Sequence, residues 1–291
     1  MTRREAAVLS TAEIKKIVRK STPLSPSAAQ ILRISGDQRH ELRELVRIVE
    51  CDTVLTAGIL RVANSAAFRP KEPVTSLSMA IPFLGERVVV SVALDICAHG
   101  LYQAPLKGYE SDKGDLWKHS LQTALAAREA CRFARKPIDG GLAFTAGILH
   151  DIGKTVLSPL LSGAPSEFGK ASAKGELLSY LEEERARLGT DHCEAGAVLA
   201  EHWKLPEFFR SAIKHHHEPS NAPPENAPLT FAVHVGDLAA MMNGYGTGAD
   251  SMHYRMDQAC DEYFSLDAER MSMLILAVNS EFEKIQDSLG S

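Results

Sequence analysis

His150 and Asp151 form a polar pair within the sequence Gly-Ile-Leu-His-Asp-Ile-Gly-Lys, which spans residues 147 to 154. The apolar neighbours predict that this stretch lies in the protein interior, where a carboxylate and an imidazole lose their hydration. That cost is offset only by ion pairing, hydrogen bonding or a metal ion. Any fold of this chain must therefore bring polar partners to the pair.

Polar side chains that could partner the pair are scattered along the chain on both sides of it. The candidates are His119, His192, His216, His217 and Asp237. Because adjacent residues of a helix diverge by about 100°, His150 and Asp151 can face one cluster only near a helix end, where Gly153 places them. We therefore expect the scattered partners to converge on the end of a helix.

Helical spacing supports this convergence. Asp115 and His119 stand four residues apart, and His234 and Asp237 stand three apart, so each pair shares one helix face. We expect Asp115, His217 and Lys154 at the margin of the cluster, and three other histidines, His202, His215 and His253, outside it.

Several histidines with a carboxylate and no thiolate favour a hydrolytic or oxidation-active divalent metal, Fe, Mn or Zn, over a structural zinc site. Asp151 could bridge two ions roughly 3.5 to 4 Å apart, which would activate a bridging water and clamp phosphoryl oxygens, and Lys154 could neutralise substrate charge. This hypothesis makes Asp151 and Lys154 catalytic residues of a phosphohydrolase. The alternative is a set of neutral core histidines that hydrogen-bond to one another and to Asp151.

The composition is that of an ordinary soluble globular protein, with 45% hydrophobic and 24% charged residues among 291. A formal net charge of −5 gives no general attraction to nucleic acid, so we expect no nucleic-acid partner. The five cysteines are odd in number and lack C-x-x-C spacing, which disfavours a disulfide framework and fits the cytoplasm. No apolar run reaches the roughly 20 residues of a transmembrane segment, and the start does not resemble a signal peptide.

Apolar residues recur at steps of three and four in nearly every segment, which predicts an all-α fold. The β-branched run at 87 to 94 is assigned to a buried helix, since no neighbouring strand is available to pair with it. Further helices are expected from Asp115 to Arg135, from Pro137 to Gly153, from Pro206 to the three consecutive histidines, and from Asp267 to Leu289. The last helix packs either on its own domain or across a homodimer.

The series His119, His150-Asp151 and Asp237 resembles the HD superfamily of metal-dependent phosphohydrolases, and the added His192, His216 and His217 are similar to the HD-GYP branch. The first half of the chain matches the pattern of the HDOD family at Asp52, Leu55, Leu60, Arg61, Asn64, Ser65, Ser76, Ala80, Ile81, Leu84, Gly85 and Arg87. The resemblance runs from about residue 23 to residue 237. It implies an N-terminal helical bundle packed on an HD-like helical domain.

The resemblance and the linker signals divide the chain into four parts. We expect a basic N-terminal helix at 1–20, which holds six Lys or Arg against two Glu, the N-terminal helical half at 21–108, the HD-like half at 109–250 and a C-terminal helix at 251–291. The basic helix is either a partner or lipid contact or a solvated helix packed by its apolar edge, and we favour the second.

Two departures from the family patterns bear on function. Thr53 stands where the HDOD pattern prefers proline, and Pro219-Ser220-Asn221 replaces the Gly-Tyr-Pro loop of cyclic di-GMP phosphodiesterases. The loss of that loop makes hydrolysis of cyclic di-GMP a weaker expectation for this chain. HDOD proteins are mostly regarded as signalling or regulatory proteins. We therefore favour a regulatory protein that binds a signalling partner or a small nucleotide ligand, over a metal-dependent phosphohydrolase that acts on a nucleotide or cyclic dinucleotide.

Overall fold

A computed structural model describes residues 9–18, 27, 30–31, 34, 42–64, 70–85, 89, 92–93, 96, 102, 104–162, 180–248 and 254–289. Within these ranges the regular structure is helical, and strand-like pairing is confined to two isolated bridges, Leu106 with Ser111 and Ala134 with Phe264. The prediction of an all-α fold is confirmed. Val89, Val92 and Ala93 are helical as well, so the described part of the β-branched run follows the prediction.

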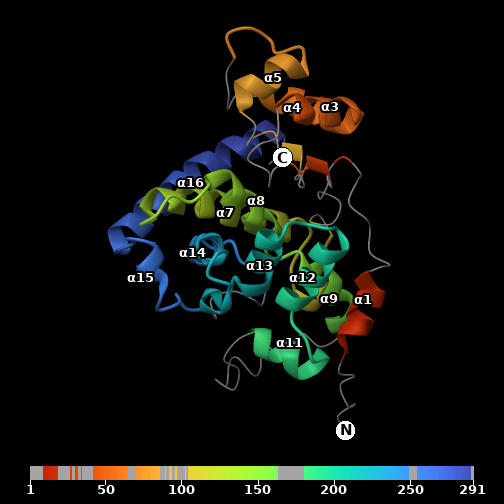
Figure 1. The fold of residues 1–291 in the computed structure, drawn as a ribbon, viewed down its shortest axis with the longest axis vertical. Helices are drawn as coiled ribbons and strands as arrows, with labels where there is room; N and C mark the ends of the chain where they lie inside the picture. The colour runs from red at the N-terminus through yellow and green to blue at the C-terminus, as the bar shows by residue number, and fades with distance from the viewer. Residues whose placement is uncertain are drawn as a thin grey trace.

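The described core of the N-terminal half consists of α3 (Leu42–Glu50), α4 (Thr53–Ala63) and α5 (Leu77–Leu84), grouped at one end of the molecule (Figure 1). Asp52 accepts a hydrogen bond from the Leu55 amide at the start of α4, and Ser76 caps α5 in the same way. Asn64 both donates to the Val74 carbonyl and accepts from the Val74 amide. These residues of the HDOD pattern therefore fix the ends of the helices.

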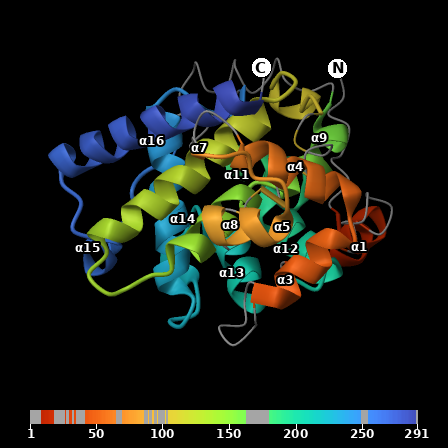
Figure 2. The same cartoon turned by 90° about the horizontal axis from the view of Figure 1, so that it is seen from above.

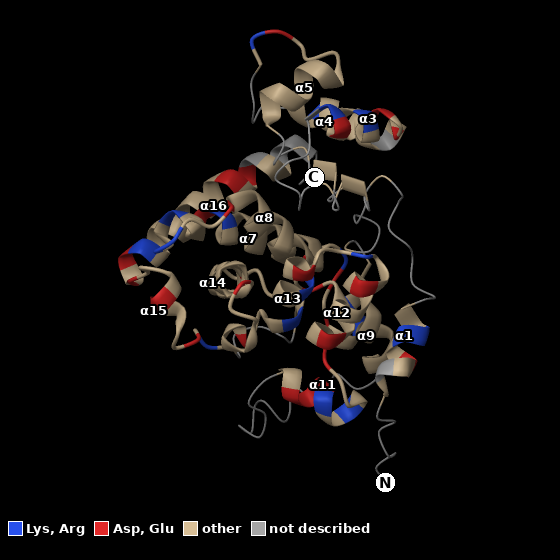
Figure 3. Ribbon diagram, viewed as in Figure 1, with Lys and Arg blue, Asp and Glu red and all other residues tan. Residues whose placement is uncertain are grey.

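The centre of the second half is built on α7 (Asp115–Ala130), which packs against α8 (Gly140–Leu149), α14 (Ala227–Met242) and α16 (Ala268–Leu289). Figure 2 shows α16 lying along α7. Fourteen of the sixteen residues of α14 are buried, so the helix is enclosed on all sides. Figure 3 shows how few charges α8 and α14 carry, and Asp237 is the one charged side chain that α14 brings into this interior.

A second group of helices covers the end of this core that holds the His-Asp pair. It comprises α9 (Gly153–Leu161), α11 (Tyr180–Leu188), α12 (His192–His202) and α13 (Glu207–His215). The short helix α1 (Thr11–Val18) packs on α12 and buries Ile14 and Val18, which is the apolar edge expected of the basic segment. Its Lys15 pairs with Glu201 of α12 at 3.2 Å.

Buried apolar residues of both halves join in one continuous core. A polar link crosses it, since the Tyr102 hydroxyl donates to the carbonyl oxygen of Ile148 at 2.6 Å, next to the His-Asp pair. The N-terminal half therefore touches the segment from which the candidate site is built.

Several helix boundaries differ from the prediction. The helix expected from Asp115 to Arg135 ends at Ala130, and a 3-10 turn, η2 (Cys131–Phe133), follows it. The helix expected from Pro137 begins at Gly140, because the Asp139 carboxylate accepts from the amides of Gly141 and Leu142 and so caps it there. The same helix ends at Leu149 instead of Gly153, which leaves His150 and Asp151 in the turn that follows.

The C-terminal region consists of α15 (Cys260–Tyr263) and α16. Met271, Leu274, Val278 and Phe282 of α16 are buried against the core, whereas Met273 and Leu276 are 56% and 70% exposed. Packing on its own domain thus accounts for one side of α16, and a homodimer through the other side stays a prediction. Within the described residues no helix combines the length and apolarity needed to cross a membrane.

Candidate metal centre

The turn between α8 and α9 presents His150 and Asp151 to the interior, and both side chains are buried. The turn is tight because α9 approaches α12 closely at Gly153. A Cβ at this position would lie 1.9 Å from the carbonyl oxygen of His192. Glycine here therefore lets the His-Asp turn sit directly beside the start of α12.

Four atoms around the turn form a first donor group: His119 Nε2, His150 Nε2, Asp151 Oδ2 and Asp237 Oδ1. His119 Nε2 lies 3.2 Å from His150 Nε2, 3.3 Å from Asp151 Oδ2 and 3.2 Å from Asp237 Oδ1. His150 Nε2 lies 3.5 and 3.6 Å from the same two oxygens. Tetrahedral ligands of one ion, each 2.0 to 2.2 Å from it, stand about 3.3 to 3.6 Å apart. The two histidines have this spacing to each carboxylate, and His119, His150 and Asp237 together form one potential ligand group for an ion.

A second donor group lies on the other side of Asp151. Its members are Asp151 Oδ1, His192 Nε2, His216 Nε2 and His217 Nε2. Asp151 Oδ1 lies 3.4 Å from His192 Nε2 and 3.6 Å from His216 Nε2, and His192 Nε2 lies 3.1 Å from His217 Nε2. Asp151 thus directs one carboxylate oxygen into each group, which is the arrangement of a bridging ligand.

Hydrogen bonds orient four of the imidazoles through their Nδ1 atoms. His119 Nδ1 lies 2.6 Å from the Tyr245 carbonyl oxygen, and His150 Nδ1 lies 2.7 Å from that of Gly147. A carbonyl oxygen can only accept, so these Nδ1 atoms carry the proton and leave a lone pair on Nε2, as metal-binding histidines require. His216 follows the same rule, with Nδ1 2.8 Å from the Ile213 carbonyl oxygen.

The fourth imidazole, His192, is held by the carboxylate of Glu184 in α11. Glu184 is fully buried and accepts from the His192 amide at 2.8 Å and from His192 Nδ1 at 2.9 Å. The Tyr109 hydroxyl donates to its other oxygen. Sequence reasoning missed Glu184, because it lies in a run of three glutamates that nothing distinguishes from a solvated helix face.

His234 shares a helix with Asp237 but does not face the donor groups. Its Nδ1 donates to the His216 carbonyl oxygen at 2.7 Å, and its Nε2 accepts from the Asp257 amide at 3.0 Å. His234 therefore holds the segment that carries His216 and His217 in place, and it is not one of the candidate ligands.

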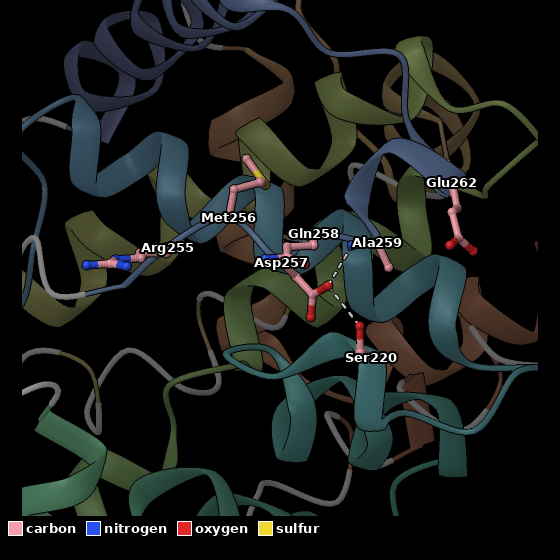
Figure 4. A pocket seen from close by; sticks show the side chains of 7 residues that line it. All are labelled: Ser220, Arg255, Met256, Asp257, Gln258, Ala259 and Glu262. Atoms are coloured by element: carbon pink, nitrogen blue, oxygen red, sulfur yellow. Dashed lines mark hydrogen bonds between the residues drawn. The ribbon is translucent and has the colours of Figure 1, made fainter.

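The segment that holds Tyr254 and Asp257 contacts the second donor group at His217. The Tyr254 ring stacks on the His217 ring with centroids 3.7 Å apart. The Asp257 carboxylate accepts from the Ser220 hydroxyl and from the Ala259 amide (Figure 4). A surface hollow lies there, and none of the residues that line it is a candidate donor: Ser220, Arg255, Met256, Asp257, Gln258, Ala259 and Glu262 (Figure 4). The hollow is thus separate from the buried cluster.

The electrostatics of the cluster are set by burial and by the two carboxylates. For His119 the cost of burial is outweighed by Asp151 and Asp237, which raise its pKa to about 9. Burial also opposes charge on Asp151, but Lys154 and His150 hold the pKa of this carboxyl well below its usual range. Burial and the neighbouring His216 lower the pKa of His217. The carboxylates are thus anionic and at least one imidazole takes up a proton in their field.

Three buried polar atoms of the cluster lack a hydrogen bond within the described part of the chain: Asp151 Oδ1, Asp237 Oδ2 and His217 Nδ1. A buried polar atom left unsatisfied costs about 1 to 3 kcal/mol, and more for a charged group. A divalent cation between the donors would satisfy Asp151 Oδ1 and neutralise the carboxylates. The residues present therefore fit a divalent metal ion, and three overlapping subsets of them have ligand atoms within 4.8 Å of one another.

The candidate ligands named from the sequence are brought together, at side-chain exposures of 3% or less: His119, His150, Asp151, His192, His216, His217 and Asp237. Lys154 is buried beside them, with Nζ 2.6 Å from Asp151 Oδ2 and 2.8 Å from Thr247 Oγ1. Asp115 instead accepts from the Asp112 amide at the start of α7. His202 is exposed and His215 half-buried, whereas His253 lies outside the described residues.

One donor was missed. Cys193 Sγ lies 3.9 and 4.0 Å from the two ring nitrogens of His216, so the premise that the cluster has no thiol is wrong. Because Cys193 follows His192 directly and lacks a second cysteine at metal-binding spacing, no sequence pattern pointed to it.

Comparison with known proteins places this fold in context. A structure from Marinobacter aquaeolei VT8, described as a candidate signal transduction protein, superposes with a TM-score of 0.73 at 22% identity over 99% of this chain and 63% of that one. An HDOD domain protein with unknown function from Geobacter sulfurreducens gives 0.64 at 20% identity, covering 96% of this chain and 94% of that one. A candidate phosphohydrolase from Shewanella amazonensis SB2B gives 0.58 at 20% identity, covering 92% and 97%. At these identities the likeness is one of fold.

Sequence comparison agrees with the fold. An uncharacterized protein of Treponema pallidum (strain Nichols) is 24% identical over 199 residues, which are 68% of this chain and 38% of that protein. The chain thus spans well under half of that relative and 63% of the Marinobacter structure. The HDOD domain model matches residues 22–219, about two thirds of the chain. The chain therefore belongs to the HDOD domain family.

Proposed function

We propose that this chain is a metal-binding regulatory protein, in which a buried centre of two divalent ions fixes the shape of the helical body that a signalling partner or a small nucleotide ligand recognises. The observation that carries the proposal is the convergence of seven donor side chains from α7, the α8–α9 turn, α12, the end of α13 and α14. Each is exposed by 3% or less. Ions held by five separate segments would tie those segments together.

Burial favours regulation over turnover. A phosphoryl substrate has to reach the metal ions, but the second donor group is covered by Tyr254, stacked on His217. Lys154, the residue expected to neutralise substrate charge, is held by Asp151 and Thr247. A centre closed in this way contributes through folding free energy, because metal ligation is coupled to the order of the segments that supply the ligands.

A second function, metal-dependent hydrolysis of a nucleotide or cyclic dinucleotide, is favoured by one observation. The two oxygens of Asp151 address separate donor groups, as a bridging carboxylate does in a dinuclear centre. Such a pair of ions, when bound, lowers the pKa of a bridging water and stabilises phosphoryl oxygens. In this alternative Asp151 and Lys154 are catalytic, and Tyr254 with its segment must move to admit the substrate.

Metal analysis combined with an activity assay separates the two functions. Protein purified without chelator is analysed for Fe, Mn and Zn, and is then incubated with bis(4-nitrophenyl) phosphate and with a cyclic dinucleotide. The regulatory proposal expects about two bound ions, no turnover, and a lower melting temperature after metal removal. Turnover that disappears in Asp151→Asn but persists in Asp261→Asn, an exposed carboxylate of α15, would establish the hydrolase instead. Absence of bound metal under all loading conditions would overturn both.

A further inference from the structure

The thiol of Cys193 lies at the edge of the second donor group. The residue is 4% exposed, and its Sγ lies 3.9 Å from His216 Nδ1 and 4.0 Å from His216 Nε2. The ligand atoms of His192, Cys193, His216 and His217 all lie within 4.8 Å of one another. The second donor group therefore contains sulfur within reach, whereas the first offers only nitrogen and oxygen.

The start of α12 explains how two adjacent residues reach one site. Asp191 caps the helix by accepting from the Glu194 amide at 2.8 Å, and Glu184 accepts from the His192 amide. These bonds fix the first turn of α12 and hold it against α11, and Cys193 in that turn lies beside His216 at the end of α13. Cys193 is thus held in the interface between α12 and α13 while His192 points toward Asp151.

A second observation points to an ion at this place. Asp151 Oδ1 is buried, has no hydrogen bond within the described residues, and lies 3.4 Å from His192 Nε2 and 3.6 Å from His216 Nε2. Cys260 provides a contrast within the same chain. It is also buried, at 5% exposure, but belongs to none of the potential ligand groups found among the described residues. Burial of a thiol alone thus does not single out Cys193, and the convergence of donors does.

We propose that Cys193 is a ligand of the second metal position, where it adds sulfur to the histidine nitrogens and the Asp151 oxygen and makes the position selective for Zn²⁺ or another thiophilic divalent ion. The inference rests on the metal centre proposed above. On binding, a metal–sulfur bond forms, the S–H bond breaks, and the proton leaves to solvent. Tetrahedral nitrogen ligands stand about 3.4 Å apart, and a nitrogen and a sulfur ligand about 3.6 Å apart.

The distances present come close to these values. His192 Nε2 and His217 Nε2 are 3.1 Å apart, and Cys193 Sγ and His216 Nε2 are 4.0 Å apart. Shifts of about half an ångström would bring both pair distances to ligand spacing. Binding of one ion also requires Sγ to move from beside the His216 ring, where it is 3.9 Å from Nδ1, toward the side of Nε2. The first position, with two nitrogens and two carboxylate oxygens, suits Mn²⁺ or Fe²⁺ better, since thiolate favours Zn²⁺ and carboxylate favours harder ions. The two positions are therefore expected to differ in metal preference.

Cobalt substitution tests the inference with a readout independent of activity. Metal-free protein is titrated with Co²⁺, and the near-ultraviolet charge-transfer band of a cobalt–thiolate bond is recorded for the wild type, Cys193→Ser and the control Cys260→Ser. We expect the band in the wild type and in Cys260→Ser, and its loss in Cys193→Ser. Co²⁺ bound without this band, or a band that survives in Cys193→Ser, overturns the assignment of Cys193 alone. No Co²⁺ binding at all would overturn the metal centre itself.

A measurement on the unaltered protein covers the case in which Cys193→Ser does not fold. X-ray absorption at the zinc edge of zinc-loaded wild type is expected to show a sulfur neighbour at about 2.3 Å. A zinc environment of nitrogen and oxygen alone would exclude Cys193 as a ligand. Alkylation of the cysteines in the unfolded, metal-free protein, followed by peptide analysis, confirms that Cys193 entered the assay as a free thiol.

Discussion

Replacing Glu184 by glutamine probes the orientation of His192 with little change in size. Glu184 accepts from three donors, the His192 amide, His192 Nδ1 and the Tyr109 hydroxyl. Glutamine keeps one acceptor oxygen and replaces the other by an amide NH₂ group, which donates. At least one buried donor then loses its acceptor, and the amide NH₂ faces another donor, so His192 Nε2 no longer has a fixed direction toward Asp151.

The expected magnitude follows from these contacts. Loss of a residue that orients a metal ligand costs about 10- to 100-fold in metal affinity, which corresponds to about 1.4 to 2.7 kcal/mol. The metal-free protein should also lose about 1 to 3 kcal/mol of unfolding free energy, because a buried donor is left unsatisfied. The two effects are measured separately, by competition with a chelator of known affinity and by denaturant unfolding in EDTA.

Glu183→Gln is the matched control. Glu183 lies next to Glu184 in α11, is 15% exposed in its side chain and pairs with Arg187 of the same helix. Its replacement should change metal affinity by less than about twofold and stability by at most about 1 kcal/mol, as is usual for such pairs. A folded Glu184→Gln protein that binds metal as tightly as the wild type would refute the reasoning, because His192 would then not be a ligand oriented by Glu184.

Three further results are expected. Asp151→Asn should remove at least one of two bound ions while the chain stays helical, because the Asp151 carboxylate faces both donor groups. Metal analysis and circular dichroism test this, and full retention of both ions would contradict it. The stability of metal-free and metal-loaded protein should respond oppositely to pH. The pKa of His119 is raised from 6.5 to about 9, so in the metal-free protein the stabilisation from its protonation is complete below pH 6.5 and is lost as pH rises through 9. Metal binding displaces that proton, so metal affinity rises with pH over the same range. Melting temperatures that fall with pH under both conditions would count against this. Gly153→Ala should destabilise the protein by about 1 to 3 kcal/mol and lower metal affinity, because the added methyl group meets the His192 carbonyl oxygen at 1.9 Å. Gly244→Ala is the control for glycine replacement, since a Cβ there meets nothing within 4 Å. Its own cost is the strain of a positive φ at a residue with a side chain.

Sequence periodicity predicted the helical class because the apolar faces repeat at the helical period whichever helix they pack against. The candidate donors were named from the His150-Asp151 pair, which needs polar partners when buried, and from the resemblance to the HD superfamily and its HD-GYP branch. The position of His150 and Asp151 at a helix end followed from the divergence of neighbouring side chains, and the structure places them in the turn between Leu149 and Gly153.

The other parts of the site could not be predicted, because they depend on contacts between segments distant in sequence. Glu184 acts on His192 from another helix, Tyr254 covers His217 from beyond α14, and Cys193 approaches His216 across a helix interface. Nothing local distinguishes these residues from an exposed glutamate, a loop tyrosine or a core cysteine. Helix boundaries were misplaced for a related reason, since a single capping carboxylate such as Asp139 decides where a helix starts.

Anomalous diffraction from crystals of protein purified without chelator tests the central claim most directly. Data collected at the Fe and Zn edges are expected to show two peaks about 3.5 to 4 Å apart, one among His119, His150 and Asp237 and the other among His192, His216 and His217, with Asp151 between them. Histidines and carboxylates that hydrogen-bond only to one another, with no anomalous peak between them even after crystals are soaked in Zn²⁺, would contradict the account.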